Sequence, residues 1–283
     1  MKNKMKHIIC FSQGHSSGLV AVEVVRKFGK ENVILVNHAM NNKVEEQDIR
    51  RFGKELSDYL EIAITYVNYQ NIIQIENIPT QFQICKDAGA FKNPNTSNAL
   101  CTARLKTEPF NNYLKEYFSD KNCIIYYGFD AKETLRIERR ASILGASGYK
   151  TDYPLALWKD RTIFSTNEIG IKPPNIYNKF KHANCTGCLK GGMWHWYVTY
   201  CERYDLFCDG KNTEDELGYT ILRKSINGVQ TPFPLEDFEP IFSLMKLNNV
   251  PATEHLPFGE QRKYLKQYSL EVEQNEKPCE CFV

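Results

Sequence analysis

The 283-residue sequence has no long hydrophobic run and no strong excess of charge of either sign. No stretch approaches the about 18 uninterrupted apolar residues that a membrane-spanning helix needs, so we expect no membrane partner. The apolar core of the N-terminal stretch MKNKMKHIICFSQG is also too short for a signal peptide. A net charge of +2 indicates no global attraction to nucleic acids. Together these absences predict a cytoplasmic globular protein.

Internal repeats and low-complexity tracts are also absent, and the first half of the chain instead alternates apolar runs of two kinds. Short continuous runs indicate buried strands, whereas apolar residues three and four apart indicate helices. Strands are expected at residues 7–11, 33–37, 62–67 and 123–127, and helices at residues 19–28 and 44–60. This alternation predicts an α/β fold with a doubly wound, mostly parallel sheet that helices cover on both faces.

Two regions depart from this alternation. Residues 81–100 hold clusters of Gly, Asn, Pro and Ser and are expected to loop out from the sheet. From about Pro154 onward, proline and glycine pairs interrupt short elements, and the aromatic run MWHWYVTYCERYDLF is expected to form a helix whose rings serve packing. We therefore predict two domains, an α/β core of residues 1–153 and a smaller, cysteine-containing C-terminal subdomain of residues 154–283.

Ten cysteines are many for a protein of a reducing compartment, where disulfides are not expected. Four of them are paired, as C-x-x-C at Cys185 and Cys188 and as C-x-C at Cys279 and Cys281. Pairs of this kind are typical of metal or redox sites. Five others are expected to be small buried residues or inert thiols, namely Cys10, Cys85, Cys123, Cys201 and Cys208. Cys101 stays a candidate ligand.

The stretch FSQGHSSGLV joins the first expected strand to the first expected helix. It is neither a Walker A loop nor a G-x-G-x-x-G motif. It nevertheless follows the carboxyl end of a strand, where open α/β sheets bind their ligands. Its glycines let the backbone approach an anion, and Ser16 or Ser17 can cap the helix or donate to a phosphate oxygen. The stretch is either a phosphate loop or an ordinary turn with a serine cap.

The hexapeptide from Ser12 to Ser17 resembles the phosphate loop of the adenine-nucleotide alpha-hydrolase (PP-loop) superfamily. Ser16 stands where the ATP pyrophosphatases of that superfamily carry an aspartate tied to magnesium and ATP. A serine-rich loop without that aspartate is similar to the phosphoadenylyl-sulfate (PAPS) reductase branch. The resemblance implies that phosphates of an adenine nucleotide, ATP or phosphoadenylyl sulfate, are held by Ser12, Gln13, Gly14, His15, Ser16 and Ser17.

Later stretches resemble further blocks of the same reductase family, in the same order. They are CTARLKTEPF from Cys101, YGFDAKETLRIERR from Tyr127, YPLALW with the later NCTGCLKGG, and the tail KPCECFV. CTGCLKGGMWHW looks like a subgroup of reductase-like proteins that are frequent in phages and mobile elements. The resemblance implies further nucleotide contacts from Lys106, Gly128, Glu133 and Arg136.

The spacing of the arginines carries an argument of its own. Arg136 and Arg140 share one face of a helix, and arginine forks suit phosphate or sulfate oxygens. The alternative is a solvated basic face on which the arginines pair with Glu133 and Glu138. The family context favours a phosphate contact for Arg136.

The C-x-x-C motif indicates a soft metal or redox chemistry, and a tetrahedral zinc or a [4Fe–4S] cluster needs two further ligands. In the iron–sulfur reductases of the family, a cysteine pair and the C-x-x-C hold the cluster, but Thr102 replaces the second member of that pair here. We favour a site of Cys101, Cys185, Cys188 and Cys279, with Cys281 as nucleophile. In the competing arrangement the four paired cysteines bind the metal and Cys101 does not. A structural zinc without a catalytic thiol is a third possibility.

The family resemblance implies an enzyme for sulfonucleotide reduction or a related sulfur transfer. The Cys281 thiolate would attack sulfur, and a thioredoxin-like donor would then restore the thiol. A first alternative is ATP-dependent, iron–sulfur-assisted thiolation of a nucleic acid. A second is a catalytically inactive nucleotide-binding protein with a structural zinc.

Overall fold

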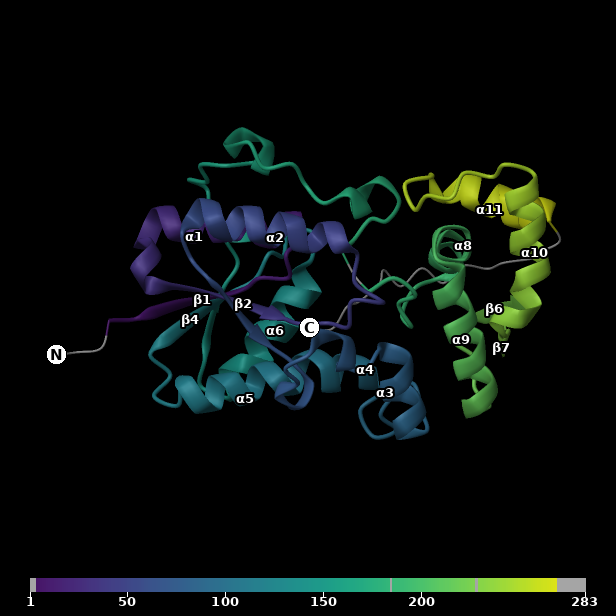
Figure 1. Ribbon diagram of the computed structural model, residues 1–283, viewed down its shortest axis with the longest axis horizontal. Coiled ribbons are helices and arrows are strands. Elements are labelled where there is room, and N and C mark those ends of the chain that lie inside the picture. Colours follow the sequence, from purple (N-terminus) through teal and green to yellow (C-terminus); the bar gives the residue numbers. More distant parts are fainter. Residues whose placement is uncertain (1–3, 184, 227–228, 269–283) are drawn as a thin grey trace. The chain divides into compact units, whose positions relative to one another are not determined.

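The computed structural model describes residues 4–183, 185–226 and 229–268 (Figure 1). They form two compact units, each built from separate stretches of the chain. Unit 1 contains the described residues up to Met40, together with Glu46–Ile78 and Leu105–Asn175. Unit 2 contains the rest. The sequence suggested a single boundary after residue 153, whereas residues 79–104 belong to unit 2 in the structure.

Unit 1 is built on one five-stranded sheet in which every pair of neighbouring strands is parallel. Its strands are β1 (Lys6–Cys10), β2 (Val33–His38), β3 (Ile64–Val67), β4 (Cys123–Tyr126) and β5 (Lys150–Asp152). Their order in space is β3-β2-β1-β4-β5. The predicted α/β class with a parallel sheet is thereby confirmed, and β5 is a strand that the apolar pattern did not reveal.

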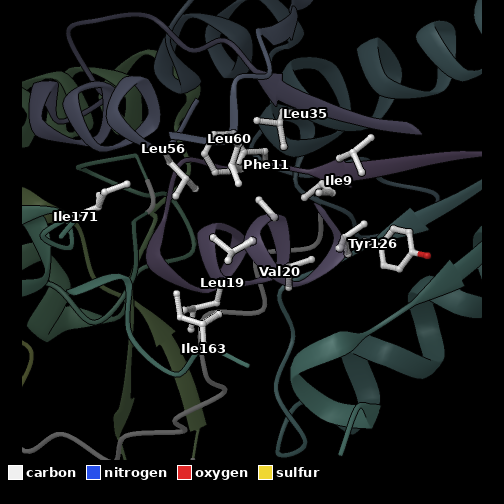
Figure 2. Close-up of a cluster of buried hydrophobic side chains, with 14 of the residues drawn as sticks. Ile9, Phe11, Leu19, Val20, Leu35, Leu56, Leu60, Tyr126, Ile163 and Ile171 are labelled. Carbon is white, nitrogen blue, oxygen red and sulfur yellow. The ribbon is translucent and has the colours of Figure 1, made fainter. Parts of the chain in front are cut away.

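Helices lie on both faces of this sheet. Figure 1 shows α1 (His15–Phe28) and α2 (Gln47–Leu60) on one side, and α5 (Glu108–Tyr117) and α6 (Thr134–Ala146) on the other. A hydrophobic cluster fills the core between β1, β2, α1 and α2, and Figure 2 shows the side chains that converge there. Among them Ile9, Phe11 and Val20 are completely buried. Their burial fixes α1, and with it the loop that precedes α1, against the sheet.

The strand order reverses between β1 and β4, so that β2 and β3 extend the sheet on one side of β1 and β4 and β5 on the other. At such a switch point the loops that follow the two central strands diverge, and ligands of open α/β sheets bind at the carboxyl ends there. In unit 1 these loops are residues 11–14, between β1 and α1, and residues 127–133, between β4 and α6.

Unit 2 is mainly helical. It contains α3 (Gln81–Ala88), α4 (Leu100–Thr102), α8 (Met193–Glu202), α9 (Tyr204–Leu217), α10 (Leu235–Leu247), α11 (Phe258–Gln267) and the hairpin of β6 (Arg223–Ile226) and β7 (Val229–Pro232). The aromatic run expected as one helix is divided into α8 and α9 at Arg203. Its rings serve packing as expected, since Trp196 and Tyr197 are completely buried.

The expectation of a loop over residues 81–100 was wrong for its first half. Thr80 caps α3 through a complete capping box with Gln83, and Gly89 in the left-handed conformation ends the helix. Phe82, Ile84 and Cys85 of this short helix are buried. In the part of the chain that the structure describes, no helix has the length and apolarity to cross a bilayer.

Candidate functional site

The loop after β1 delivers the N-terminus of α1 to the carboxyl edge of the sheet. Gly14 is the N-cap residue, and in the described structure no side chain caps this end or places an acidic group in the first turn. The expected serine cap is therefore absent, and Ser16 and Ser17 stand inside the first turn. Ser17 Oγ donates a hydrogen bond to the Gly14 carbonyl, and Ser12 Oγ lies 3.2 Å from Ser17 Oγ. Uncapped first-turn N–H groups and the helix dipole make this end suitable for an anion.

The side chains of Gln13 and His15 are held by other parts of unit 1. Gln13 is only 1% exposed, and a Cβ atom at Gly53 of α2 would lie 2.2 Å from its Oε1. His15 Nε2 accepts a hydrogen bond from Thr166 N at 3.3 Å, and burial lowers the pKa of His15. These side chains therefore shape the loop, and the two residues' contribution to an anion site would come from their backbone.

Gly128 joins the two loops of the switch point. A Cβ atom at this position would lie 2.9 Å from the carbonyl carbon of Ser16 and from Ser17 N. Both are backbone atoms, which no rotamer change can move aside. The loop after β4 thus touches the first turn of α1 backbone to backbone, and only glycine allows this approach. Of the predicted site residues, the structure brings Gly128, Ser16 and Ser17 together.

The two arginines predicted to share a helical face both lie over aromatic rings. Arg136 lies 4.3 Å from the ring centroid of Phe129, and Arg140 lies 5.4 Å from that of Tyr127. These two rings stack with a centroid distance of 5.4 Å. Arg136 also forms an ion pair with Glu133, as in the alternative of a paired basic face. The aromatic surface thereby restricts both guanidinium groups to one side of α6.

Sequence reasoning missed two buried polar groups at this edge. Tyr127, directly after β4, is 3% exposed, and its hydroxyl meets the thiol of Cys10 at the end of β1. Burial raises the pKa of Cys10 to about 12, so this thiol is not a nucleophile near neutral pH. His38 ends β2 and is 8% exposed. Its position after the apolar run VILVN, where a strand reaches its carboxyl end, is the signal that could have identified it.

Lys106 and Arg140 both act electrostatically on His38. Burial, followed by these two positive charges, lowers the pKa of His38 to about 3. The predicted Lys106 is therefore close to His38 at the carboxyl end of β2. Arg140 is close to His38 as well and also lies over the Tyr127 ring. The carboxyl edge of unit 1 combines an uncapped helix N-terminus with two cationic side chains, an arrangement suited to phosphate or sulfate.

In unit 2, the C-x-x-C motif forms a turn that is held by its backbone. Gly187 within the motif has φ +71°, the left-handed region that favours glycine. Thr186 N donates to Val44 O at 2.9 Å. Gln81 Nε2 of α3 donates to the carbonyls of Thr186 and Gly187 at 3.0 and 3.1 Å. Both cysteines of the motif, Cys185 and Cys188, are half-buried on this turn.

His195 of α8 also supports this turn. Cys188 N donates to His195 Nε2 at 3.0 Å, so Nε2 is unprotonated and Nδ1 carries the proton. That proton faces Glu254 Oε1 at 2.7 Å. A carboxylate thus orients an imidazole that in turn fixes the backbone of a cysteine. His195 therefore has a structural role, and the sequence analysis did not foresee its link to the C-x-x-C motif.

Cys101 lies beside a thiol that the sequence analysis set aside. The Cys85 and Cys101 thiols form a hydrogen bond, and this bond, together with burial, raises the pKa of Cys85. Cys279 and Cys281 lie outside the described residues. Within the described residues no three His, Cys, Asp or Glu side chains converge closely enough to hold a metal ion. The C-x-x-C turn has the donor chemistry for a soft metal, but the described ligands alone do not complete a four-coordinate site.

No protein-family model matches the sequence, and no curated protein shows significant similarity to it.

Proposed function

We propose that the protein binds an adenine nucleotide by its phosphates at the carboxyl edge of the unit 1 sheet, and that it catalyses sulfonucleotide reduction or a related sulfur transfer. The observation that carries the nucleotide part is the backbone contact of Gly128 with the first turn of α1. This contact places an uncapped helix N-terminus at the switch point of a parallel sheet, where such folds take their ligands.

The charges around the carboxyl edge of the sheet support a phosphate as the group held at this edge. No carboxylate occupies the first turn of α1, and Lys106 and Arg140 add positive charge at the same edge. An anion at a helix N-terminus is stabilised by about 0.3–2 kcal/mol, and each charge-assisted hydrogen bond adds about 1.5–3 kcal/mol. Contributions of this size are enough to favour a nucleotide clearly over its nucleoside.

The sulfur chemistry is supported by the resemblance of the cysteine motifs to those of PAPS reductases. In this proposal the Cys281 thiolate attacks the sulfur of the substrate and forms an S–S bond, while the S–O bond to the phosphate breaks and the nucleotide leaves. A thioredoxin-like dithiol donor then releases the sulfur as sulfite, restores the Cys281 thiol and is itself oxidised to a disulfide. The C-x-x-C turn in unit 2 has a rigid backbone that suits a positioned thiol pair. No step of this reaction involves a metal centre.

Binding of adenine nucleotides tests the first part. We expect calorimetry on the full chain to show an adenosine 5′-monophosphate affinity at least about tenfold above that of adenosine, since one charge-assisted phosphate contact is worth about 1.5–3 kcal/mol. Equal affinities for nucleotide and nucleoside would contradict a phosphate site at this edge.

Turnover tests the second part. With phosphoadenylyl sulfate and a dithiol donor we expect sulfite release, and Cys281→Ser should abolish it, with Cys201→Ser as the matched control in α8. Sulfur found instead in co-expressed tRNA or DNA would favour the nucleic-acid alternative. Nucleotide binding without turnover, together with bound zinc, would favour the inactive binding protein.

A metal centre of zinc or a [4Fe–4S] cluster at the paired cysteines is proposed separately. After anaerobic purification we expect metal analysis and the visible spectrum to reveal about one zinc or cluster per chain, held by Cys185 and Cys188. Cys188→Ser should remove most of this metal, whereas Cys201→Ser should leave it. Full metal content in Cys188→Ser would exclude the motif as a ligand pair.

A further inference from the structure

We propose that His38, Lys106 and Arg140 form a subsite for an oxyanion, a phosphate or sulfate group, in which His38 Nε2 contacts an oxygen of the anion directly. The proposal rests on the nucleotide-binding function proposed above and deepens it, because it names the residues that recognise one charged group of the ligand. All three residues belong to unit 1.

The first step is the state of the His38 side chain. The residue is only 8% exposed, and its ring packs edge to face against Phe110 of α5 at 5.6 Å between centroids. Nε2 has no hydrogen-bond partner among the described residues. A buried polar nitrogen without a partner costs about 1–3 kcal/mol, and such groups in native proteins call for an explanation, such as a bound ligand.

The second step is the charge around this nitrogen. The two charged groups that act on His38 are Lys106 and Arg140, and both are positive. A metal ion or another cation would be repelled at this place, although an unpartnered imidazole nitrogen is otherwise a common metal ligand. An anion is attracted by both charges. The group that completes the hydrogen bonding of His38 is therefore an oxyanion.

The third step is the position of the three residues in the fold. His38 is the last residue of β2, the neighbour of β1 in the sheet, and its backbone pairs with Val67 of β3. Lys106 lies in the π-helical turn Ala103–Thr107, two residues before α5 begins at Glu108, and Arg140 lies one turn beyond Arg136 on α6. The subsite is thus at the same carboxyl edge as the N-terminus of α1. A nucleotide that places one phosphate on α1 can place a second charged group here.

A phosphate or sulfate group gives Nε2 an acceptor, so that the proton of the ring moves to Nε2 or a second proton binds. In either case the nitrogen-15 signal of Nε2 changes from that of an unpartnered ring nitrogen to that of a hydrogen-bond donor.

The experiment is an NMR titration of the full chain with labelled histidine at neutral pH. The sequence has six histidines, and the His38 signal is identified by its loss in His38→Gln. Inorganic phosphate, inorganic sulfate, adenosine 3′,5′-bisphosphate and adenosine are added in separate titrations. We expect the first three to shift the Nε2 signal of His38 and adenosine to leave it unchanged. His7 is the internal control, because its Nδ1 is already hydrogen-bonded to the Tyr126 hydroxyl at 2.8 Å, and its signal should not shift.

Variants supply the second measurement. His38→Phe keeps the ring packing against Phe110 but removes the nitrogen, and we expect the affinity for adenosine 3′,5′-bisphosphate, which carries a second phosphate, to fall by about tenfold or more. His38→Gln retains an amide donor and should recover most of that loss. Circular dichroism and thermal melting show whether either variant folds, and the titration of the unaltered protein does not depend on them.

The outcomes separate this inference from the proposed function. If the nucleotide binds but neither shifts the His38 signal nor loses affinity in His38→Phe, the subsite is wrong and nucleotide binding stands. If phosphate or sulfate shifts the signal and no adenine nucleotide binds, the subsite stands and the proposed function fails. No response of His38 to any of the anions overturns the inference.

Discussion

Replacing Gly128 with alanine is expected to destabilise unit 1 by about 2 kcal/mol or more and to abolish high-affinity nucleotide binding. The added methyl group would lie 2.9 Å from backbone atoms of Ser16 and Ser17, and essentially no Cβ atom approaches backbone atoms so closely. Either the loop after β4 or the first turn of α1 has to move. Overpacking of this kind typically costs about 1–3 kcal/mol, and here the displaced atoms are the N–H-bearing backbone of the proposed phosphate site.

Gly145→Ala in α6 is the matched control for this variant. A Cβ atom at position 145 meets no atom within 4 Å, and the residue is in helical conformation. Alanine there should raise stability by about 0.5–1 kcal/mol, because it removes the helix penalty of glycine. Denaturant unfolding and calorimetry with adenosine 5′-monophosphate check both variants. Unchanged affinity in Gly128→Ala would contradict the placement of the phosphate at this contact.

The sheet of unit 1 was predictable because its central strands are buried on both faces. Such strands appear as continuous apolar runs, and the runs at residues 7–11, 33–37 and 123–127 lie within one residue of β1, β2 and β4. Strand β5 was missed for the same reason. Its three residues, Lys-Thr-Asp, are exposed or half-buried at the edge of the sheet and carry no apolar pattern.

Helix α3 shows where composition misled the sequence analysis. Residues 81–100 were assigned to a loop because of their many turn-forming residues, yet these concentrate after Gly89. The local signals for a helix were present before that point, with Thr80 and Gln83 in a capping box and Gly89 as terminator. Eight residues were too few for the apolar periodicity to outweigh the composition of the whole window.

The candidate site was predictable where its geometry is local. The loop between β1 and α1, and the spacing of Arg136 and Arg140, follow from neighbouring positions in the chain. The role of His38 depends on which strands are adjacent and on a helix more than sixty residues away, so the sequence alone contains no direct sign of it. Cys85 likewise meets Cys101 only because α3 and α4 pack together.

Glu214 of α9 is expected to make unit 2 less stable as the pH rises. The residue is 4% exposed, and its two carboxylate oxygens accept from Ile221 N and Leu235 N at 2.6 Å each. Burial, which these two bonds only partly offset, raises the pKa of Glu214 from 4.5 to about 7. The folded state therefore holds a proton that the unfolded chain releases.

The direction of the effect follows from this difference. Below pH 4.5 the carboxyl is protonated in both states, and its stabilising contribution is complete. Between pH 4.5 and about 7 the unfolded state loses the proton first, and the contribution is lost. A shift of about 2.5 pKa units corresponds to about 3 kcal/mol. Glu254 acts in another window, because its lowered pKa reduces stability only as the pH falls below 4.5.

Glu214→Gln removes the ionisation, but its amide NH2 cannot accept from a backbone N–H, so the variant loses one of the two hydrogen bonds at every pH. At about pH 4 we expect the variant to be less stable than the parent by about 1–3 kcal/mol, and between about pH 4 and pH 8 the parent alone should lose about 3 kcal/mol. Trp158→Phe as a common background leaves Trp194 and Trp196 of α8 as fluorescent reporters of unit 2. Urea unfolding at both pH values measures the difference. If the difference in stability between Glu214→Gln and the parent is the same at both pH values, the two backbone N–H groups compensate the buried charge fully and the prediction is wrong.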